Sequence, residues 1–248
     1  MRIVTTLKSI RWKITRAGLR QVVKRAARRV LINHAVEDAN GHSYRWLHSD
    51  IETFMASVEA DVSALRPQAT LDALPSFGTQ LMVEFATYTI SAGRVLRNLG
   101  VPAKVTRQLV SDLGWDIYRR LLGLTSAPVR MMTRDPGRRI RWTIRMLLWF
   151  PFGAHGAPGY AVETSRDGDD ILTHFTHCPP QTLARRLSEQ EGDPEILEVF
   201  RKSWCTYDWP GADLIADDGH RGHYRRTRTL SHGDSVCDMC WIARSAQQ

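Results

Sequence analysis

The chain has 248 residues, 43% of them hydrophobic and 24% charged, which is the composition of a globular protein with one large domain. Its formal net charge of +8 comes from one segment, because residues 1–36 hold ten of the 34 Lys and Arg residues and no acidic residue. The rest of the chain has 24 basic and 26 acidic residues. The composition therefore excludes a domain-wide nucleic-acid footprint, and we expect no specific nucleic-acid partner.

The chain has no run of about 18 uncharged apolar residues, so we expect neither a transmembrane helix nor a secretory signal. Its four cysteines are unevenly spaced and do not resemble a disulfide framework. These features predict a cytoplasmic protein, and peripheral association at the membrane is the alternative.

The first predicted element is a basic amphipathic helix over residues 8–33, with an apolar stripe that includes Leu19, Val23 and Ala27. Such a helix can lie on an anionic membrane surface or dock on a partner protein. It also resembles an organellar transit peptide, and the simplest alternative is that its stripe packs on the body. We divide the chain into a basic arm, 1–36, and a single α+β domain, 37–248, that is helical over 48–150 and contains the sheet over 158–244.

The helical part begins after a turn at Asn40-Gly41. Apolar periodicity predicts helices over residues 51–64 (ending before Arg66-Pro67), 76–99 and 103–123, the last two as an antiparallel pair. Residues 128–152 contain a turn at Asp135-Pro-Gly137, and a short helix then carries Arg138, Arg141 and Arg145 and ends in aromatic residues. This segment suits a membrane interface, the lid of an apolar pocket, or a core helix with snorkelling arginines.

Strand character begins after Gly159. We predict hairpin strands over 160–164 and 171–176, helices from Pro179 to Leu187 and from Pro194 to Cys205, and a second hairpin with strands over 224–230 and 236–243. The predicted fold is α+β, with an N-terminal helical part packed on a small antiparallel sheet that has inserted helices.

Four motifs in the second half of the chain contain three of its cysteines. They are Cys178-Pro before a helix, Cys-x-x-Asp at 205–208, Arg-Thr-x-Thr-Leu-x-x-Gly-Asp at 226–234, and Cys237-Asp238. In order and spacing, residues 160–241 resemble the L-2-amino-thiazoline-4-carboxylic acid hydrolase family. The resemblance implies a bacterial hydrolase that opens a 2-aminothiazoline ring to give N-carbamoyl-L-cysteine, and relatives in biosynthetic clusters that act on other rings. The family more often has Cys-Asp-Phe where this chain has Cys237-Asp-Met, which concerns the substrate more than the fold.

Ring opening of this kind needs a nucleophile at an amidine-like carbon, and a thiolate can serve. Cys178 precedes a helix, whose dipole favours the thiolate, so it is the first candidate nucleophile and Cys205 the second. The resemblance adds Cys237. The alternative to a catalytic role is that each cysteine is simply a small buried hydrophobic residue.

Polar partners for a small-molecule substrate lie in the same motifs. Asp208 and Asp238 are candidates for a general base or for holding an amidinium group, although both could instead brace turns. Arg226 and Arg228, expected on one strand face, could bind a substrate carboxylate, and Thr229 completes the predicted substrate site.

No metal or other cofactor is expected. Cys237-x-x-Cys240 with Cys205, Cys178 or His177 could supply zinc ligands, but one Cys-x-x-Cys pair is weak, and on a strand its two members face opposite sides. Two further hypotheses remain open. One is an enzyme on the same scaffold that acts on a larger apolar substrate, with residues 128–152 shaping the pocket. The other is a non-catalytic, membrane-associated ligand-binding module.

Overall fold

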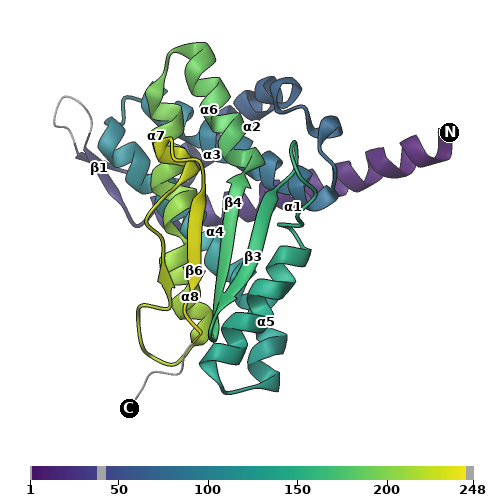
Figure 1. The fold of residues 1–248 in the computed structure, drawn as a ribbon. Coiled ribbons are helices and arrows are strands. Elements are labelled where there is room, and N and C mark those ends of the chain that lie inside the picture. The colour runs from purple at the N-terminus through teal and green to yellow at the C-terminus, as the bar shows by residue number, and fades with distance from the viewer. Residues whose placement is uncertain (1, 38–42, 244–248) are drawn as a thin grey trace.

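The computed structural model describes residues 2–37 and 43–243, and it has the predicted α+β fold with a small antiparallel sheet (Figure 1). The turn predicted at Asn40-Gly41 lies outside the described residues. The α-helices are α1 (Arg2–Leu31), α2 (His48–Ala69), α3 (Phe77–Asn98), α4 (Ala103–Met132), α5 (Pro136–Trp149), α6 (Pro179–Glu191), α7 (Pro194–Ser203) and α8 (Asp208–Ala216). Short 3-10 turns are η1 (Leu71–Ala73), η2 (Trp204–Thr206) and η3 (Leu230–His232). The strands are β1 (Ala35–Glu37), β2 (Ser43–Arg45), β3 (Ala161–Asp167), β4 (Asp170–His177), β5 (Tyr224–Arg225) and β6 (Cys237–Trp241).

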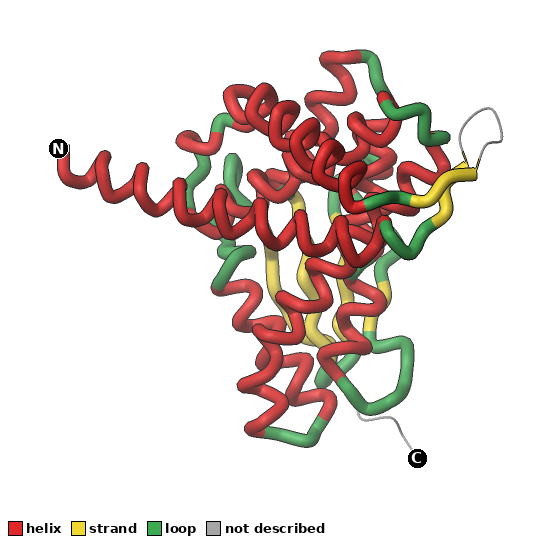
Figure 2. Tube along the Cα trace, turned by 180° about the vertical axis from the view of Figure 1, so that it is seen from behind, coloured by secondary structure: helices red, strands yellow, loops and turns green. Residues whose placement is uncertain are grey.

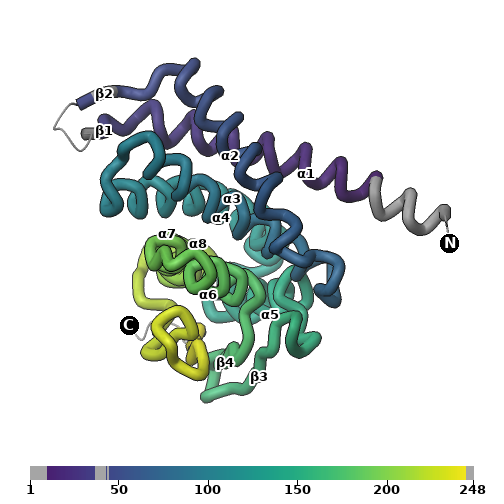
Figure 3. The backbone as a smooth tube through the Cα atoms, turned by 90° about the horizontal axis from the view of Figure 1, so that it is seen from above, coloured from purple at the N-terminus to yellow at the C-terminus, as the bar shows by residue number. Residues whose placement is uncertain are grey.

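The helices form a layer behind the four-stranded sheet, as the views from behind and from above show (Figures 2 and 3). Helix α3 is central to this layer and contacts α2, α4, α6 and α7. Its N-cap Ser76 accepts the backbone N–H of Thr79, which explains where the helix begins. Its buried face then joins two apolar clusters, one with α1, α2 and α4 and one with α6 and α7. The sheet is thus supported by helices that come from both halves of the chain.

The apolar stripe of α1 packs on the body, with Leu19, Ala26 and Leu31 buried among residues of α2, α3 and α4. Its basic residues form ion pairs with the body as well. Arg16 from α1 and Arg66 from α2 both reach the fully buried carboxylate of Glu84 on α3, at 3.2 and 2.8 Å. The half of the basic arm from Trp12 onward is therefore a structural part of the helical layer.

Two helices run past the ends that the sequence predicts. Helix α2 continues through Pro67 to Ala69, and α4 continues through Gly123 and Pro128 to Met132. Pro67 lies in the last turn, where it removes one backbone hydrogen bond while Ala69 is buried in the core. In α4, the buried side chains of Ser126 and Val129 continue the packed face beyond Gly123. Tertiary packing outweighs the local helix-ending signals at both sites.

The sheet has the order β3-β4-β6-β5, and every neighbouring pair is antiparallel. In β4, Ile171, Thr173 and Phe175 are buried against the helices, while the alternate residues lie on the outer face. The register pairs Phe175 with Cys237 and His174 with Asp238. Cys237 therefore points towards the helices, whereas Asp238 lies on the outer face.

The last third of the chain differs from the prediction in two elements. The strand expected over 224–230 stops at Arg225, because carboxylate side chains of Asp238 and Asp234 accept the backbone N–H groups of Thr227, Arg228 and Thr229. These bonds replace those of a continued strand ladder. Helix α8 was not predicted from the sequence. In the structure Pro210 lies in its first turn, which tolerates proline.

Gly137, in the first turn of α5, provides a stability test. A Cβ added there would lie 2.0 Å from the backbone oxygen of Ala243, so the contact cannot be relieved by a side-chain movement. We expect Gly137→Ala to lower the free energy of unfolding by about 1–3 kcal/mol, the usual range for overpacking. Chemical denaturation would measure this change.

Gly123→Ala is the matched control, because a Cβ at that helical glycine meets no atom within 4 Å. We expect this change to raise stability by about 0.5–1 kcal/mol through the lower helix propensity of glycine. Equal effects of the two substitutions would contradict the close approach of α5 to the end of β6.

Candidate functional site

The structure brings three of the predicted cysteines into one region. Cys178 is the N-cap of α6, Cys205 lies in η2 after α7, and Cys237 begins β6. The pKa of the Cys178 thiol is raised mainly by burial, and electrostatic interactions with Cys237, Cys205 and Asp208 raise it further, so these four groups are electrostatic neighbours. All four cysteines of the chain are free thiols. The predicted cysteine constellation is thus a spatial cluster, which we call the thiol cluster (Cys178, Cys205, Cys237).

Cys237 is the most enclosed member of the thiol cluster. Its sulfur accepts the backbone N–H of Leu230 at 3.3 Å and lies 3.4 Å from the Thr229 hydroxyl. It packs with Tyr160 and Phe175, and Cys178 lies against the same apolar group. Thr229, one of the predicted site residues, therefore contacts the thiol cluster through Cys237.

Cys205 has the most polar surroundings of the three thiols. Its sulfur lies 3.2 Å from the Ser231 hydroxyl. Burial raises the pKa of Cys205 to about 11, although the hydrogen bond with Ser231 and the positive charge of Arg226 both oppose this shift. Ser231 lies within the 226–234 motif, but the sequence alone gave no reason to single it out.

Cys178 occupies the helix N-terminus that the sequence predicts. A backbone N–H from Gln181 favours its thiolate, but burial has the larger effect and raises the pKa of the thiol. The position at the start of α6 is therefore as expected, whereas the expected lowering of the pKa is absent. Desolvation destabilises the thiolate here more than the first turn of the helix stabilises it.

Asp208 and Arg226 form a buried pair beside Cys205. One guanidinium nitrogen of Arg226 lies 3.6 Å from the Asp208 carboxylate, and another donates to the backbone oxygen of Cys205 at 2.6 Å. The guanidinium also stacks 4.8 Å from the ring of Trp209. This pairing fixes η2 and the start of α8 against the sheet edge.

The Asp208 carboxylate also accepts a hydrogen bond from the Tyr224 hydroxyl at 3.2 Å. Burial raises the pKa of Asp208 to about 6, while Arg226 and Tyr224 pull it down. Its side chain is 17% exposed, so water reaches it. A carboxylate that titrates near neutral pH beside thiols has the properties of a general base. The strand alternation in the sequence placed Tyr224 on the same face as Arg226, but it did not indicate the hydrogen bond with Asp208.

Asp238 and Arg228 lie apart from the thiol cluster. Asp238 accepts hydrogen bonds from the backbone and hydroxyl of Thr227 and from Arg228, and these outweigh the effect of burial and lower its pKa. The Arg228 side chain is 54% exposed, whereas that of Arg226 is 7% exposed. The expectation that the two arginines share one face is wrong because the strand ends at Arg225. Asp238 braces the loop, the alternative that its sequence context left open.

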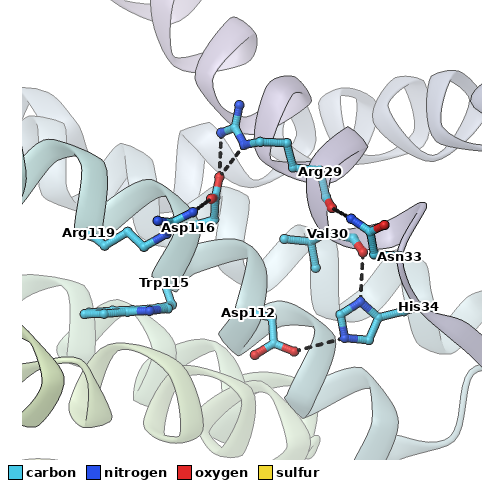
Figure 4. A pocket seen from close by; sticks show the side chains of 8 residues that line it. All are labelled: Arg29, Val30, Asn33, His34, Asp112, Trp115, Asp116 and Arg119. Atoms are coloured by element: carbon cyan, nitrogen blue, oxygen red, sulfur yellow. Dashed lines mark hydrogen bonds and ion pairs between the residues drawn. The ribbon is translucent and has the colours of Figure 1, made fainter.

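A separate concavity of about 440 Å³ lies between α1 and α4 (Figure 4). Its charged groups bind one another, since Arg29 and Arg119 both contact Asp116, and His34 lies 3.5 Å from Asp112. None of the candidate site residues lines it. We regard it as the seam where α1 docks on α4.

Within residues 2–37 and 43–243, no group of three or more His, Cys, Asp or Glu side chains has the geometry to hold a metal ion. The register of β6 places Cys237 and Cys240 on opposite faces, because they pair with Phe175 and Leu172. In the same described part of the chain, no helix is long and apolar enough to cross a bilayer.

The raised pKa of Asp208 predicts a pH dependence of stability. Because the folded pKa of about 6 lies above the ordinary value of 3.8 for an aspartate, the folded protein binds this proton more tightly, and the free energy of unfolding falls as pH rises between these values. Asp208→Asn removes the cost of the buried charge. The stability of this variant relative to wild type should increase by up to about 3 kcal/mol between about pH 4 and pH 7.

Asp169→Asn is the control, because it removes the same carboxylate charge from a side chain that is 70% exposed. Urea unfolding at several pH values would measure both variants. If the stability difference between Asp208→Asn and wild type did not change with pH, the pKa of Asp208 would not be raised in the folded protein.

In comparisons with known proteins, no family model, curated protein or solved structure matches the chain. The family resemblance is therefore carried only by the motifs within residues 160–241, and function is proposed from the geometry of the thiol cluster.

Proposed function

We propose that the chain is a hydrolase that opens a small cyclic amidine, such as a 2-aminothiazoline carboxylate, with a cysteine as the nucleophile. The supporting observation is that Cys178, Cys205 and Cys237 gather beside a carboxylate whose pKa is raised to about 6. Thiols next to a base that ionises near neutral pH suit nucleophilic catalysis at an electron-poor carbon. The motif resemblance supports the same class of reaction.

Cys205 is the preferred nucleophile in this proposal. Its pKa is about 11, and the Ser231 hydroxyl and the Arg226 cation both favour its thiolate. Asp208 is the general base, because it is an electrostatic neighbour of Cys205. It lies three residues later in the chain, at the start of α8. Cys178 is the second candidate, since the backbone N–H of Gln181 favours its thiolate but burial opposes it more strongly.

The reaction proceeds in two balanced stages. The cysteine transfers its proton to Asp208, and its sulfur bonds to the ring carbon between sulfur and nitrogen. The ring carbon–sulfur bond then breaks, and the departing sulfur takes the proton from Asp208, which leaves an isothiourea on the enzyme. Water, deprotonated by Asp208, adds to the same carbon, and its second proton passes to the imine nitrogen as the carbonyl forms. The cysteine thiolate is expelled and takes back the proton from Asp208. The net change is addition of one water, and the product is a urea that bears a free thiol.

A second candidate substrate class is a similar ring with a larger apolar substituent. Leu148 and Phe152, from the segment that ends α5, pack against the apolar group that contains Tyr160, Phe175 and Cys237. Cys178 contacts this same group. Residues 128–152 thus contribute side chains to the apolar side of the thiol cluster, which favours a substrate that presents an apolar surface there.

The nucleophile is tested by Cys205→Ser and Cys178→Ser, assayed for release of free thiol from 2-aminothiazoline-4-carboxylate and from 5-alkyl derivatives. We expect Cys205→Ser to lower kcat by at least about a thousandfold, because removal of a nucleophile eliminates the covalent route. Cys178→Ser should keep kcat within about tenfold of wild type.

Cys240→Ala is the matched control, since Cys240 is buried on the opposite face of β6 from Cys237. Its kcat should stay within about threefold of wild type. Wild-type activity in both serine variants would eliminate covalent catalysis through these residues, and a wild-type enzyme inactive on every ring offered would reject the substrate class.

The base is tested by the pH profile of kcat/KM. Since Asp208 must be ionised to accept a proton, activity should rise as pH increases through about 6, the pKa of its carboxyl. Asp208→Asn should abolish this acidic limb and lower kcat/KM by about a hundredfold or more, the usual effect of removing a general base. An unchanged limb in the variant would assign the base to another group.

A further inference from the structure

A basic stripe on α5 has no part in the proposed chemistry. Arg138, Arg141 and Arg145 follow one another at helical spacing and face Arg166 on β3 across a concavity of about 260 Å³, which Trp142 also lines. Arg166 lies on this side of the sheet because it pairs with Ile171, whose side chain faces the helices. Four cations thus share one narrow groove, which we call the arginine groove.

The arginine groove has very little compensating negative charge. The one acidic residue that lines it is Asp169, which pairs with Arg141 at 3.3 Å. Among the residues that the structure describes, no carboxylate lies within ion-pair distance of Arg138, Arg145 or Arg166. Other arginines of the chain are used differently, since Arg94, Arg97 and Arg107 each bind a carboxylate. An unpaired cluster of this kind favours a polyanionic partner.

The basic stripe ends in exposed aromatic and apolar side chains. Trp149 follows Arg145 by one helical turn and is 86% exposed, with Met146 and Phe150 partly exposed beside it. An indole that protrudes into water is unusual for a packed domain, and tryptophan is typical of the headgroup region of a bilayer.

Aromatic contacts join the end of α5 to the helical layer. Phe150 stacks on Phe77, and Phe77 contacts both the ring of Trp12 and the guanidinium of Arg11. These contacts hold the end of α5 in place, while the side chain of Trp149 projects into water.

We propose that this surface, formed by the arginine groove and Trp149, docks on an anionic lipid bilayer. Phosphate and carboxylate headgroups match the unpaired arginines, and the protruding indole enters the interface beside them. An acidic protein or a nucleic acid would satisfy the arginines, but the headgroup region of a bilayer also suits an exposed tryptophan. The inference does not depend on the proposed hydrolysis.

The test is co-sedimentation of the full chain with vesicles of phosphatidylcholine alone or with about 30% phosphatidylserine. We expect binding only to the phosphatidylserine vesicles, and at least about tenfold weaker binding in the triple variant Arg138→Gln, Arg145→Gln, Arg166→Gln. Trp149→Ser should weaken binding several-fold while the salt dependence remains, because it removes the apolar contribution alone.

A charge-matched triple variant separates a specific surface from net charge. Lys104, Lys202 and Arg221 are exposed and lie outside the arginine groove, so their substitution by Gln should change binding by less than about twofold. Equal losses in the two triple variants would overturn the proposal, as would equal binding to vesicles without phosphatidylserine. Displacement of the protein from the vesicles by 1 mM inorganic phosphate would also overturn it, because the groove would then be a site for a soluble anion.

Discussion

The candidate site depends on a single buried guanidinium. Arg226 contacts the backbone of Cys205, the carboxylate of Asp208 and the ring of Trp209 with one planar group. These three residues lie where α7 turns through η2 into α8, a short segment outside the sheet. Arginine suits this position because its fork binds two acceptors in fixed directions while its face stacks on an indole. Removing Arg226 would leave Asp208 as an unpaired buried charge. This usually destabilises a protein more than replacing both partners by apolar residues does.

A second constraint acts on the loop after β5. The carboxylates of Asp234 and Asp238 hold three consecutive backbone N–H groups, so this segment cannot pair as a strand. It turns back instead and presents Thr229 to Cys237 and Ser231 to Cys205. Asp238 thus supports the thiol cluster from the outer face of the sheet without touching it. Asp238 can therefore belong to a functional motif because it fixes the loop that carries Thr229 and Ser231.

The elements that could be predicted from the sequence are those with strong local signals. Helix α3 has a capping serine and a continuous apolar stripe, and α6 and α7 each begin with proline after an N-cap residue. The motifs singled out Cys178, Cys205 and Cys237 as candidates, but the sequence could not show whether their sulfurs meet in space, because that depends on how α6, η2 and β6 pack together. The extension of α4 beyond Gly123 could not be predicted either, because it depends on the burial of Val129 against distant residues. The separation of Arg226 from Arg228 was equally hidden, since it requires knowing that Asp238 captures the intervening backbone.

Helix α5 links the two proposals in space. One end of it leads to Leu148 and Phe152, which pack on the apolar side of the thiol cluster, while its other face carries the arginine groove. The same helix therefore contacts both the proposed membrane surface and the packing around Cys178.

The buried state of the thiols has a consequence for the lifetime of the protein. Oxidation of cysteine to sulfenic acid proceeds through the thiolate, as does trapping by electrophiles. Burial raises the pKa of Cys178, and the pKa of Cys205 is about 11, so both are almost entirely protonated near neutral pH. Peroxide and alkylating agents would thus find few reactive sulfurs at these two positions. Two neighbouring cysteines, which would otherwise be a chemical liability, stay inert because burial keeps them protonated.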